Sequence, residues 1–324
     1  MKNSGIGGQA VLEGIMMRSA SSQAVAVRRS DGTIQVKKQT LQTPGWFAKV
    51  RKIPIVRGVC SFFISMLDGI RAINDSADML DEGESTGEEQ EKTDDRKKRT
   101  NKKDSGTGFG MVLTVLSALV IAVLLFTVLP FRLSRLFSAR ISSVTALNLI
   151  EGIIRILIFV VYLWGVSLIK DIRRTYMYHG AEHKCINCLE TGHDLTVENV
   201  LASSRFHRRC STSFLFVVVF ISVVLFIFIR SGNPAVQLLL RIALIPLIAG
   251  ISFEMLMYAG SHDNTLAKAV SAPGLLMQRL TTKEPDSQMA EVAIRAVEAV
   301  FDWRAYLAEN GKCQTTGITG DEEA

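Results

Sequence analysis

Two histidines and a glutamate lie close together in the segment Tyr178-His-Gly-Ala-Glu-His-Lys184. On a helix, His179 and His183 share one face because they are four residues apart, and Glu182 lies beside that face. Two imidazoles at this spacing can hold one transition metal ion, and a neighbouring carboxylate can act as a general base on water. The order H-x-x-E-H reverses the H-E-x-x-H pattern of zinc proteases. The segment therefore predicts a metal centre with Glu182 as its catalytic base.

Further nitrogen, sulfur and oxygen ligands follow this motif within residues 170–211. Imidazole and thiolate together suit Zn²⁺ best, with Fe²⁺ as the second choice. Because so many ligands are concentrated in one short segment, metal binding is favoured over a purely structural role for each residue. The additional candidates are Cys185, Cys188, Glu190, His193, His207 and Cys210.

Two different ligand sets fit this segment. An open catalytic site would use His179 and His183 with either His207 or Cys210, and would leave one position for water. A closed structural site would use four ligands and no water. The residues alone do not choose between the sets; the closed one consists of Cys185, Cys188, His207 and Cys210.

Long apolar runs predict a mainly α-helical integral membrane protein. The hydrophobic fraction is 48% and the mean hydropathy is positive. Each run is about long enough to cross ~30 Å of hydrocarbon as a helix. Four transmembrane helices are expected, near 108–131, 150–169, 212–229 and 236–258.

Charged residues inside these spans need partners. Glu151, Arg155 and Arg241 are expected to pair with one another. Glu254 lies late in the fourth span, and a carboxylate there is a functional-site hypothesis by default. It is a candidate metal ligand, because the reversed zinc motif commonly takes its third ligand from a downstream glutamate. The alternative is an ion pair with a basic residue at the inner rim, such as Lys170 or Arg173.

Basic residues at the ends of the spans predict the topology. They are more numerous before the first span and in the 170–211 loop than in the other flanks. This bias places both termini and the loop in the cytoplasm, where its cysteines stay reduced. The net charge of +6 is explained by these flanks, so the lipid bilayer is the expected partner and nucleic acid is not.

The remaining segments predict a small α+β cytoplasmic region. Residues 1–80 contain a β-hairpin around Asp31-Gly32 and an amphipathic helix over 55–80. The Gly-rich stretch before the hairpin is expected to be a turn that leads into a strand, and the alternative is a loop that touches a ligand. Residues 81–105 form a charged linker that is expected to be disordered. Residues 106–260 form the membrane domain, which includes the 170–211 loop. Residues 261–324 carry an amphipathic helix from Pro285 to about Leu307, followed by a disordered tail.

Several of these motifs together resemble the YqhQ family. They are Gly7-Gly-Gln-Ala-Val-Leu-Glu-Gly-Ile-Met-Met-Arg18, Tyr178-His-Gly-Ala-Glu-His-Lys184, Leu195-Thr-Val-Glu-Asn199, Arg209-Cys210 with Thr212-Ser-Phe214, Ala249-Gly-Ile-Ser-Phe-Glu254 and Leu280-Thr-Thr-Lys-Glu-Pro-Asp286. These are bacterial membrane proteins of unknown function that are often labelled metal-dependent enzymes, with no established reaction. The resemblance covers about residues 5–300.

The resemblance implies a metal and brings the Gly-rich N-terminal segment into the site. Cys185 and His262 depart from the family pattern, as do Arg208 and Ser211, so the resemblance weakens Cys185 as a ligand. The residues that carry over are His179, Glu182, His183, Cys188, Glu190, His207, Cys210 and Glu254.

The sequence therefore favours a zinc-dependent membrane enzyme, most consistent with a hydrolase. His179 and His183 would be ligands, His207 or Cys210 would complete the shell, and Glu182 would be the general base. The alternative is a non-enzymatic assembly or quality-control factor that binds other membrane proteins and uses zinc only to fold the loop. A transporter ranks third, because the spans contain few polar groups.

Overall fold

The chain forms two compact units in a computed structural model that describes residues 3–41, 52–84, 110, 113–229, 231 and 233–310. The first unit comprises Met1–Gly83, Leu163–Val218 and Ala249–Ala324, and the second comprises Glu84–Tyr162 and Val219–Ile248. The predicted linker over 81–105 lies almost entirely outside the described residues. The predicted disordered tail lies outside them from residue 311 onwards.

The first unit is built on a four-stranded antiparallel sheet in the order β1-β2-β3-β4. The predicted hairpin around Asp31-Gly32 is confirmed as β3–β4, where Gly32 has a φ of 84° and Thr33 donates its N–H to Asp31. The Gly-rich stretch, predicted to be a turn before a strand, is itself the hairpin β1–β2. The strands are β1 Gly7–Val11, β2 Gly14–Arg18, β3 Ser22–Arg28 and β4 Ile34–Thr40.

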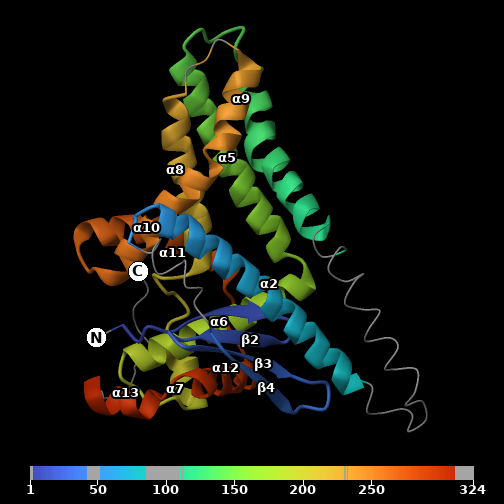
Figure 1. Ribbon diagram of the computed structural model, residues 1–324, viewed down its shortest axis with the longest axis vertical. Helices are drawn as coiled ribbons and strands as arrows, with labels where there is room; N and C mark the ends of the chain where they lie inside the picture. The colour runs from blue at the N-terminus through green and yellow to red at the C-terminus, as the bar shows by residue number, and fades with distance from the viewer. Residues whose placement is uncertain are drawn as a thin grey trace. The chain divides into compact units, whose positions relative to one another are not determined.

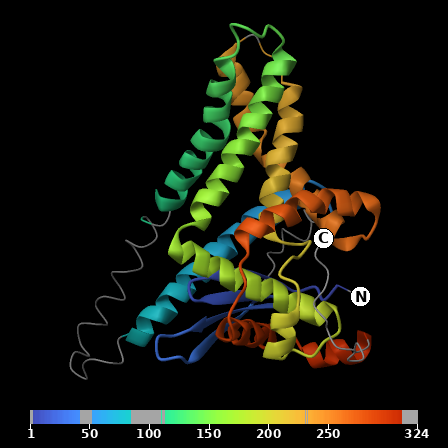
Figure 2. The same ribbon diagram turned by 180° about the vertical axis from the view of Figure 1, so that it is seen from behind.

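Helices cover both faces of this sheet. Along β2, Met16 packs with the helix α2 (Val56–Glu84), whereas Ile15 and Met17 join the core of α6 (Lys170–Glu190) and α12 (Ser287–Val300). Successive side chains of a strand alternate between faces, so a strand covered on both sides reads as one apolar run. Figure 1 shows α2 beside the sheet, and Figure 2 shows α6 and α12 from behind.

The helix α2 occupies the segment predicted to be an amphipathic helix. The predicted C-terminal helix is also present, but it breaks at Phe301 and Asp302 into α12 and α13 (Trp303–Asn310). Asp286 caps α12 by accepting a hydrogen bond from the Met289 N–H at 2.8 Å. The sequence did not predict α11 (Thr265–Thr281), which encloses Pro273. The short helix α7 (Val197–Ala202) also belongs to this unit.

The prediction of four full transmembrane helices was too high. Among the described residues, Leu113–Arg135 and α5 (Val144–Ser167) are long and apolar enough to cross a membrane. The first of these includes the π-helical turn η1 (Leu124–Val128) and ends with α4 (Leu129–Arg135). A third span requires counting the bent pair α9 (Pro234–Ala243) and α10 (Ile245–Ser261) as one.

Two local features explain why fewer helices than predicted are long enough to cross a membrane. The predicted third span is α8 (Ser211–Ile227), an apolar helix of 17 residues, or about 25 Å at helical rise. The pair α9 and α10 is bent by 43°. Pro246 sits in the first turn of α10; its ring lacks an N–H and would clash with the carbonyl of Ile242 in a continuous helix. Two or three spans are consistent with a membrane protein.

The charged residues of the second unit pair as predicted. Glu151 is buried and accepts hydrogen bonds from Arg155 at 2.7 Å and from Arg241. Asn148 accepts a further bond from Arg241 at 3.0 Å, and Arg155 also donates to Ser222 at 2.9 Å. Buried charges that are paired and hydrogen-bonded to one another explain how polar residues occur within apolar helices.

Candidate metal centre

The helix α6 places the predicted motif on a buried face. His179, Glu182 and His183 are 9%, 4% and 1% exposed. Residues on the opposite side of the helix, such as Ala181 and Cys188, belong to the core against the sheet. The core contacts therefore fix the rotation of α6, and this rotation determines where the two imidazoles point.

Cys210, which precedes α8, completes a cluster with the two histidines. One ligand atom from each of His179, His183 and Cys210 lies within 4.8 Å of the others, and all three residues are buried. The Nε2 atom of His179 is 3.1 Å from the Sγ atom of Cys210. Two imidazoles and a thiolate are a donor set that zinc accepts.

Main-chain carbonyl groups orient both imidazoles. The Nδ1 atom of His179 is 2.9 Å from the oxygen of Thr281, and the Nδ1 atom of His183 is 2.6 Å from the oxygen of Arg205. A carbonyl oxygen only accepts, so each Nδ1 must carry the proton. In the neutral ring, the lone pair then lies on Nε2, on the side of Cys210. This is the arrangement by which proteins orient histidine ligands, and it fits a bound metal ion.

Side chains of α6 also hold the segment that leads to Cys210. Lys184 donates to the main-chain oxygens of Leu201 and Ser203, both at 2.8 Å. Asn187 donates to the oxygens of Ser204 and Phe206 at 2.7 and 2.9 Å. These bonds satisfy carbonyl groups that no helix or sheet would otherwise satisfy. The irregular segment is therefore fixed against the helix that carries the histidines.

Gln278 of α11 holds the same segment on both sides of Cys210. Its side-chain oxygen accepts the His207 N–H at 2.9 Å, and its side-chain nitrogen donates to the His207 oxygen at 2.7 Å and to the Ser213 hydroxyl at 3.0 Å. Gln278 is fully buried. Because Thr281 lies one turn further along α11, this helix positions Cys210 and orients His179.

The imidazoles and the thiolate of the cluster stabilise one another's charged forms. Burial opposes protonation of His179, but the negative charge of Cys210, with Glu182 close by, raises the pKa of His179 to about 9. Burial disfavours the Cys210 thiolate, yet His179 and His183 hold the pKa of Cys210 well below its usual range. The thiolate required for metal coordination is therefore the favoured form.

Glu182 faces the same point as the ligand atoms. Its Oε2 atom is 3.6 Å from the Nε2 atom of His183 and 4.0 Å from the Nε2 atom of His179. The strand β1 packs directly on this carboxylate, because a β-carbon added at Gly8 would lie 2.8 Å from the Cγ atom of Glu182. The Gly-rich N-terminal segment thus borders the site, in agreement with the resemblance.

Three other predicted ligands lie outside the cluster. Cys188 belongs to the core and lies 3.8 and 3.5 Å from the main-chain oxygens of His193 and Asp194. Burial raises the pKa of Cys188 to about 11, so it stays a thiol. Glu254 forms a two-pronged ion pair with Arg57 of α2. An ion pair with a basic residue was the alternative predicted for Glu254, but its partner is Arg57 rather than Lys170 or Arg173.

His207, the third of these, faces a separate polar group centred on Glu190. Its Nε2 atom is 3.6 Å from the Oε2 atom of Glu190, which also pairs with Arg209 and accepts the Ser4 N–H at 2.9 Å. Burial opposes ionisation of Glu190, but bonds from His207 and Ser4 and the charge of Arg209 lower its pKa to about 2. Of the two candidates to complete the shell, the structure brings Cys210 to the histidines.

A family model described as "Protein of unknown function (DUF1385)" matches residues 53–303. The chain belongs to this family. The Bacillus subtilis (strain 168) protein named "Uncharacterized protein YqhQ" is 33% identical over 311 residues, which cover 94% of this chain and 95% of that relative. The resemblance drawn from the sequence motifs is thereby confirmed. No solved structure matches the chain.

In this DUF1385 protein, sequence reasoning missed the groups that orient the ligands. The carbonyl groups of Thr281 and Arg205 have no side-chain signature at all. Gln278 offers a weak signal, because it is a polar residue within the amphipathic stretch 265–281. Gly8 offered a stronger signal, since it belongs to a Gly-rich motif.

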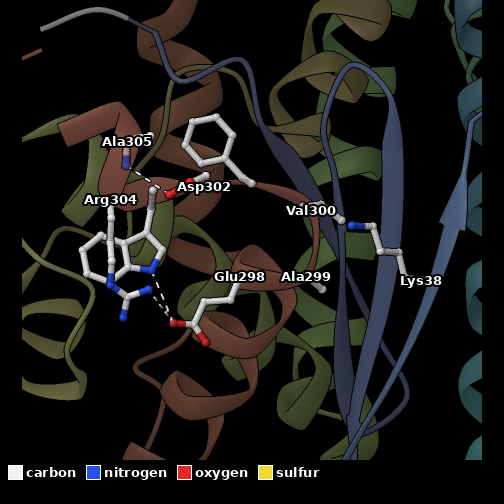
Figure 3. Close-up of a pocket in the computed structure, with 9 residues that line it drawn as sticks. Lys38, Glu298, Ala299, Val300, Asp302, Arg304 and Ala305 are labelled. Atoms are coloured by element: carbon white, nitrogen blue, oxygen red, sulfur yellow. Dashed lines mark hydrogen bonds and ion pairs between the residues drawn. The ribbon is translucent and has the colours of Figure 1, made fainter. Parts of the chain in front are cut away.

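A surface hollow of this DUF1385 protein lies away from the histidine cluster. It has a volume of about 600 Å³ and is lined by Lys38 and residues 298–305 at the junction of α12 and α13 (Figure 3). Its polar groups bond to one another: the Trp303 indole N–H donates to Glu298 at 3.4 Å, and the Ala305 N–H donates to Asp302 at 3.0 Å. None of the predicted ligands lines it, so the candidate site remains the His179–His183–Cys210 cluster.

Proposed function

We propose that this protein is a zinc-dependent hydrolase of the membrane. The observation that supports the proposal is the convergence of two Nε2 atoms, one thiolate and the Glu182 carboxylate at one buried point. A structural zinc site is closed by four ligands, whereas a catalytic site keeps three and an open position. The cluster offers three such ligands with a carboxylate beside them.

His179, His183 and Cys210 would hold the ion. When bound, Zn²⁺ would supply a positive charge that polarises the bond to be cleaved and makes water more acidic. Glu182 would accept a proton from the attacking water and return it to the leaving group, as a general base and then a general acid. The carbonyl groups of Thr281 and Arg205 would keep both imidazoles in the required tautomer.

The proposal also includes a location. The site would lie on the cytoplasmic side of the membrane with both termini, as the basic flanks indicate. The lipid bilayer would be the main partner, other membrane proteins would be substrates or partners, and nucleic acid would not be bound.

A second function is favoured by one observation, the burial of the cluster. His183 and Cys210 are 1% and 4% exposed, as in a site whose metal only stabilises the fold. The protein would then be a non-enzymatic assembly or quality-control factor for membrane proteins. Under this alternative, Glu182 would be a fourth ligand rather than a base.

Metal content and access to the metal test both functions. The full-length protein, purified without chelators, is expected to contain about one zinc per chain. The ion should be lost in His179→Ala, His183→Ala and Cys210→Ser, and retained in Glu182→Gln. His193→Ala is the matched control, because His193 bonds to Thr191 outside the cluster.

Substitution with Co²⁺ then separates the two functions. Addition of acetohydroxamate should change the visible spectrum if one coordination position is open. An unchanged spectrum, together with loss of zinc in Glu182→Gln, would instead support the structural site. If the native protein contains no stoichiometric metal, neither the zinc-dependent hydrolase nor the factor with a structural zinc can be correct.

A further inference from the structure

The strand β1 is the edge of the sheet that borders the candidate site. It pairs with β2 on one side, and no other strand lies beyond it in the described sheet. Gly8 of this strand packs against Glu182, and α6 lies against β1. The other edge strand, β4, carries the exposed residues from Val36 to Thr40. The edge at β1 therefore borders the candidate site, whereas the edge at β4 carries exposed side chains.

The register decides which main-chain groups of β1 face this open edge. The N–H of Arg28 donates to the oxygen of Glu13, which starts the hydrogen-bonded pairs between β2 and β3. In an antiparallel sheet such pairs alternate, so Ile15 and Met17 bond to β3, whereas their neighbours in β2 bond to β1. Their partners in β1 are Gly7, Gln9 and Val11. The intervening residues, Gly8 and Ala10, therefore direct their N–H and C=O groups away from the sheet.

These four main-chain groups form a ladder with the spacing of an extended polypeptide. Within the described ranges, no turn, cap or side-chain bond reaches the Gly8 or Ala10 main chain. Both residues are half-buried, so these groups are only partly accessible to water. Unpaired edge groups of this kind are the usual docking site for an added strand.

We propose that an extended segment of another protein pairs with β1 as a fifth strand and is the substrate, an inference that rests on the proposed hydrolase. The glycines of β1 favour it, because Gly8 presents no side chain between the strand and Glu182. An added strand would lie about 4.8 Å beyond β1, on the edge whose Gly8 touches the catalytic carboxylate. The ladder selects the polypeptide main chain, whereas a lipid or sugar has no matching series of donors and acceptors.

The reaction would be hydrolysis of one peptide bond. The oxygen of water would bond to the carbonyl carbon, and the bond between that carbon and the amide nitrogen would break. Glu182 would take a proton from the water and pass it to the departing nitrogen. The products are a carboxylic acid and an amine, so no oxidant or reductant is needed.

Hydrogen exchange can detect the added strand independently of cleavage. The probe is β-casein, an unfolded protein, added to the full-length, zinc-loaded Glu182→Gln variant. Exchange of the Gly8 and Ala10 amide protons is expected to slow by about tenfold or more. The amides of Val36 and Lys38, which the register places on the opposite edge, are the internal control and should not change.

A pair of proline variants links the strand to cleavage. Ala10→Pro removes an outward N–H while leaving the bonds to β2, and it is expected to lower cleavage of β-casein by the otherwise native protein about tenfold or more. Val36→Pro is the matched change on the opposite edge and should cleave normally. Zinc content of both variants checks that the site is intact.

The outcomes separate the two proposals. Cleavage with unchanged exchange at Gly8 and Ala10 would overturn the strand-pairing proposal and keep the hydrolase. Slowed exchange without cleavage by the native protein would support pairing and overturn the hydrolase. If exchange is unchanged and nothing is cleaved, both the pairing proposal and the hydrolase proposal are overturned.

Discussion

Gly180 lies so close to Lys283 that a β-carbon at position 180 would be 2.0 Å from the Lys283 main-chain oxygen. The N–H of Lys283 also donates to the oxygen of Tyr176 at 2.9 Å, so the segment after α11 runs directly along α6. Thr281, two residues earlier, accepts the proton of His179 Nδ1. The missing side chain at Gly180 thus permits the close packing that orients the first histidine.

Gly180→Ala is expected to weaken zinc binding by about 10- to 100-fold, the range found when groups that orient metal ligands are lost. The added methyl group meets main chain, which cannot rotate away, so α6 must shift from Thr281. Zinc affinity in a chelator competition measures the effect. Gly165→Ala is the control, because nothing lies within 4 Å of its added β-carbon. Equal affinities in the two variants would contradict this role for Gly180.

Gln278→Leu is expected to weaken zinc binding and to destabilise the protein. It leaves the His207 main-chain groups and the Ser213 hydroxyl without their partner, at about 1–3 kcal/mol for each buried group left unsatisfied. The free energy of unfolding and the zinc affinity should fall together, because Gln278 fixes the segment on both sides of Cys210. Gln288→Leu, at an exposed position, should change neither. Loss of stability with unchanged zinc affinity would show that Gln278 does not position Cys210.

The helical period explains how much of this site could be predicted. His179 and His183 share a face at any position along a helix, so the sequence was sufficient for that pair. Cys188 follows His183 by five residues, which is about 500° of helix and leaves it about 140° off that face. It was proposed as a ligand because candidate ligands are concentrated within residues 170–211 and because it carries over from the family resemblance. Since α6 continues to Glu190, the helical period places Cys188 away from the two histidines.

Other features depend on tertiary contacts that the sequence does not reveal. The choice between His207 and Cys210 depends on the path of an irregular segment, which main-chain bonds to Lys184 and Asn187 determine. Glu254 pairs with Arg57 because α2 crosses α10 where Gly58 meets Gly250. No local pattern could have identified that partner. The four-stranded sheet, by contrast, was only half predicted because β1 is short and rich in glycine.

Glu190 should make the stability of the protein depend on acidity. Its pKa is lowered to about 2 in the folded protein, so its contribution is complete above the ordinary glutamate range near 4.5 and is lost as the pH falls towards 2. Native protein should therefore exceed Glu190→Gln in melting temperature by a constant amount from pH 7 to 5. The difference should narrow between pH 4.5 and 3. A difference that stays constant down to pH 3 would contradict the ionised network with His207 and Arg209.

The two carboxylates of the apolar helices should differ widely in their effect on stability. Glu151 and its partners Arg155 and Arg241 are at most 3% exposed, so Glu151→Gln leaves two buried guanidinium groups without a counter-charge. Breaking a buried pair in this way costs about 3–5 kcal/mol. Glu254 and Arg57 are 23% and 40% exposed, and Glu254→Gln should cost less than about 1 kcal/mol because solvent screens such pairs. Unfolding by dodecyl sulfate in mixed micelles measures both variants under one condition. If Glu254→Gln proved as costly as Glu151→Gln, Glu254 would have a role beyond its ion pair with Arg57, and its place among the candidate ligands would have to be reconsidered.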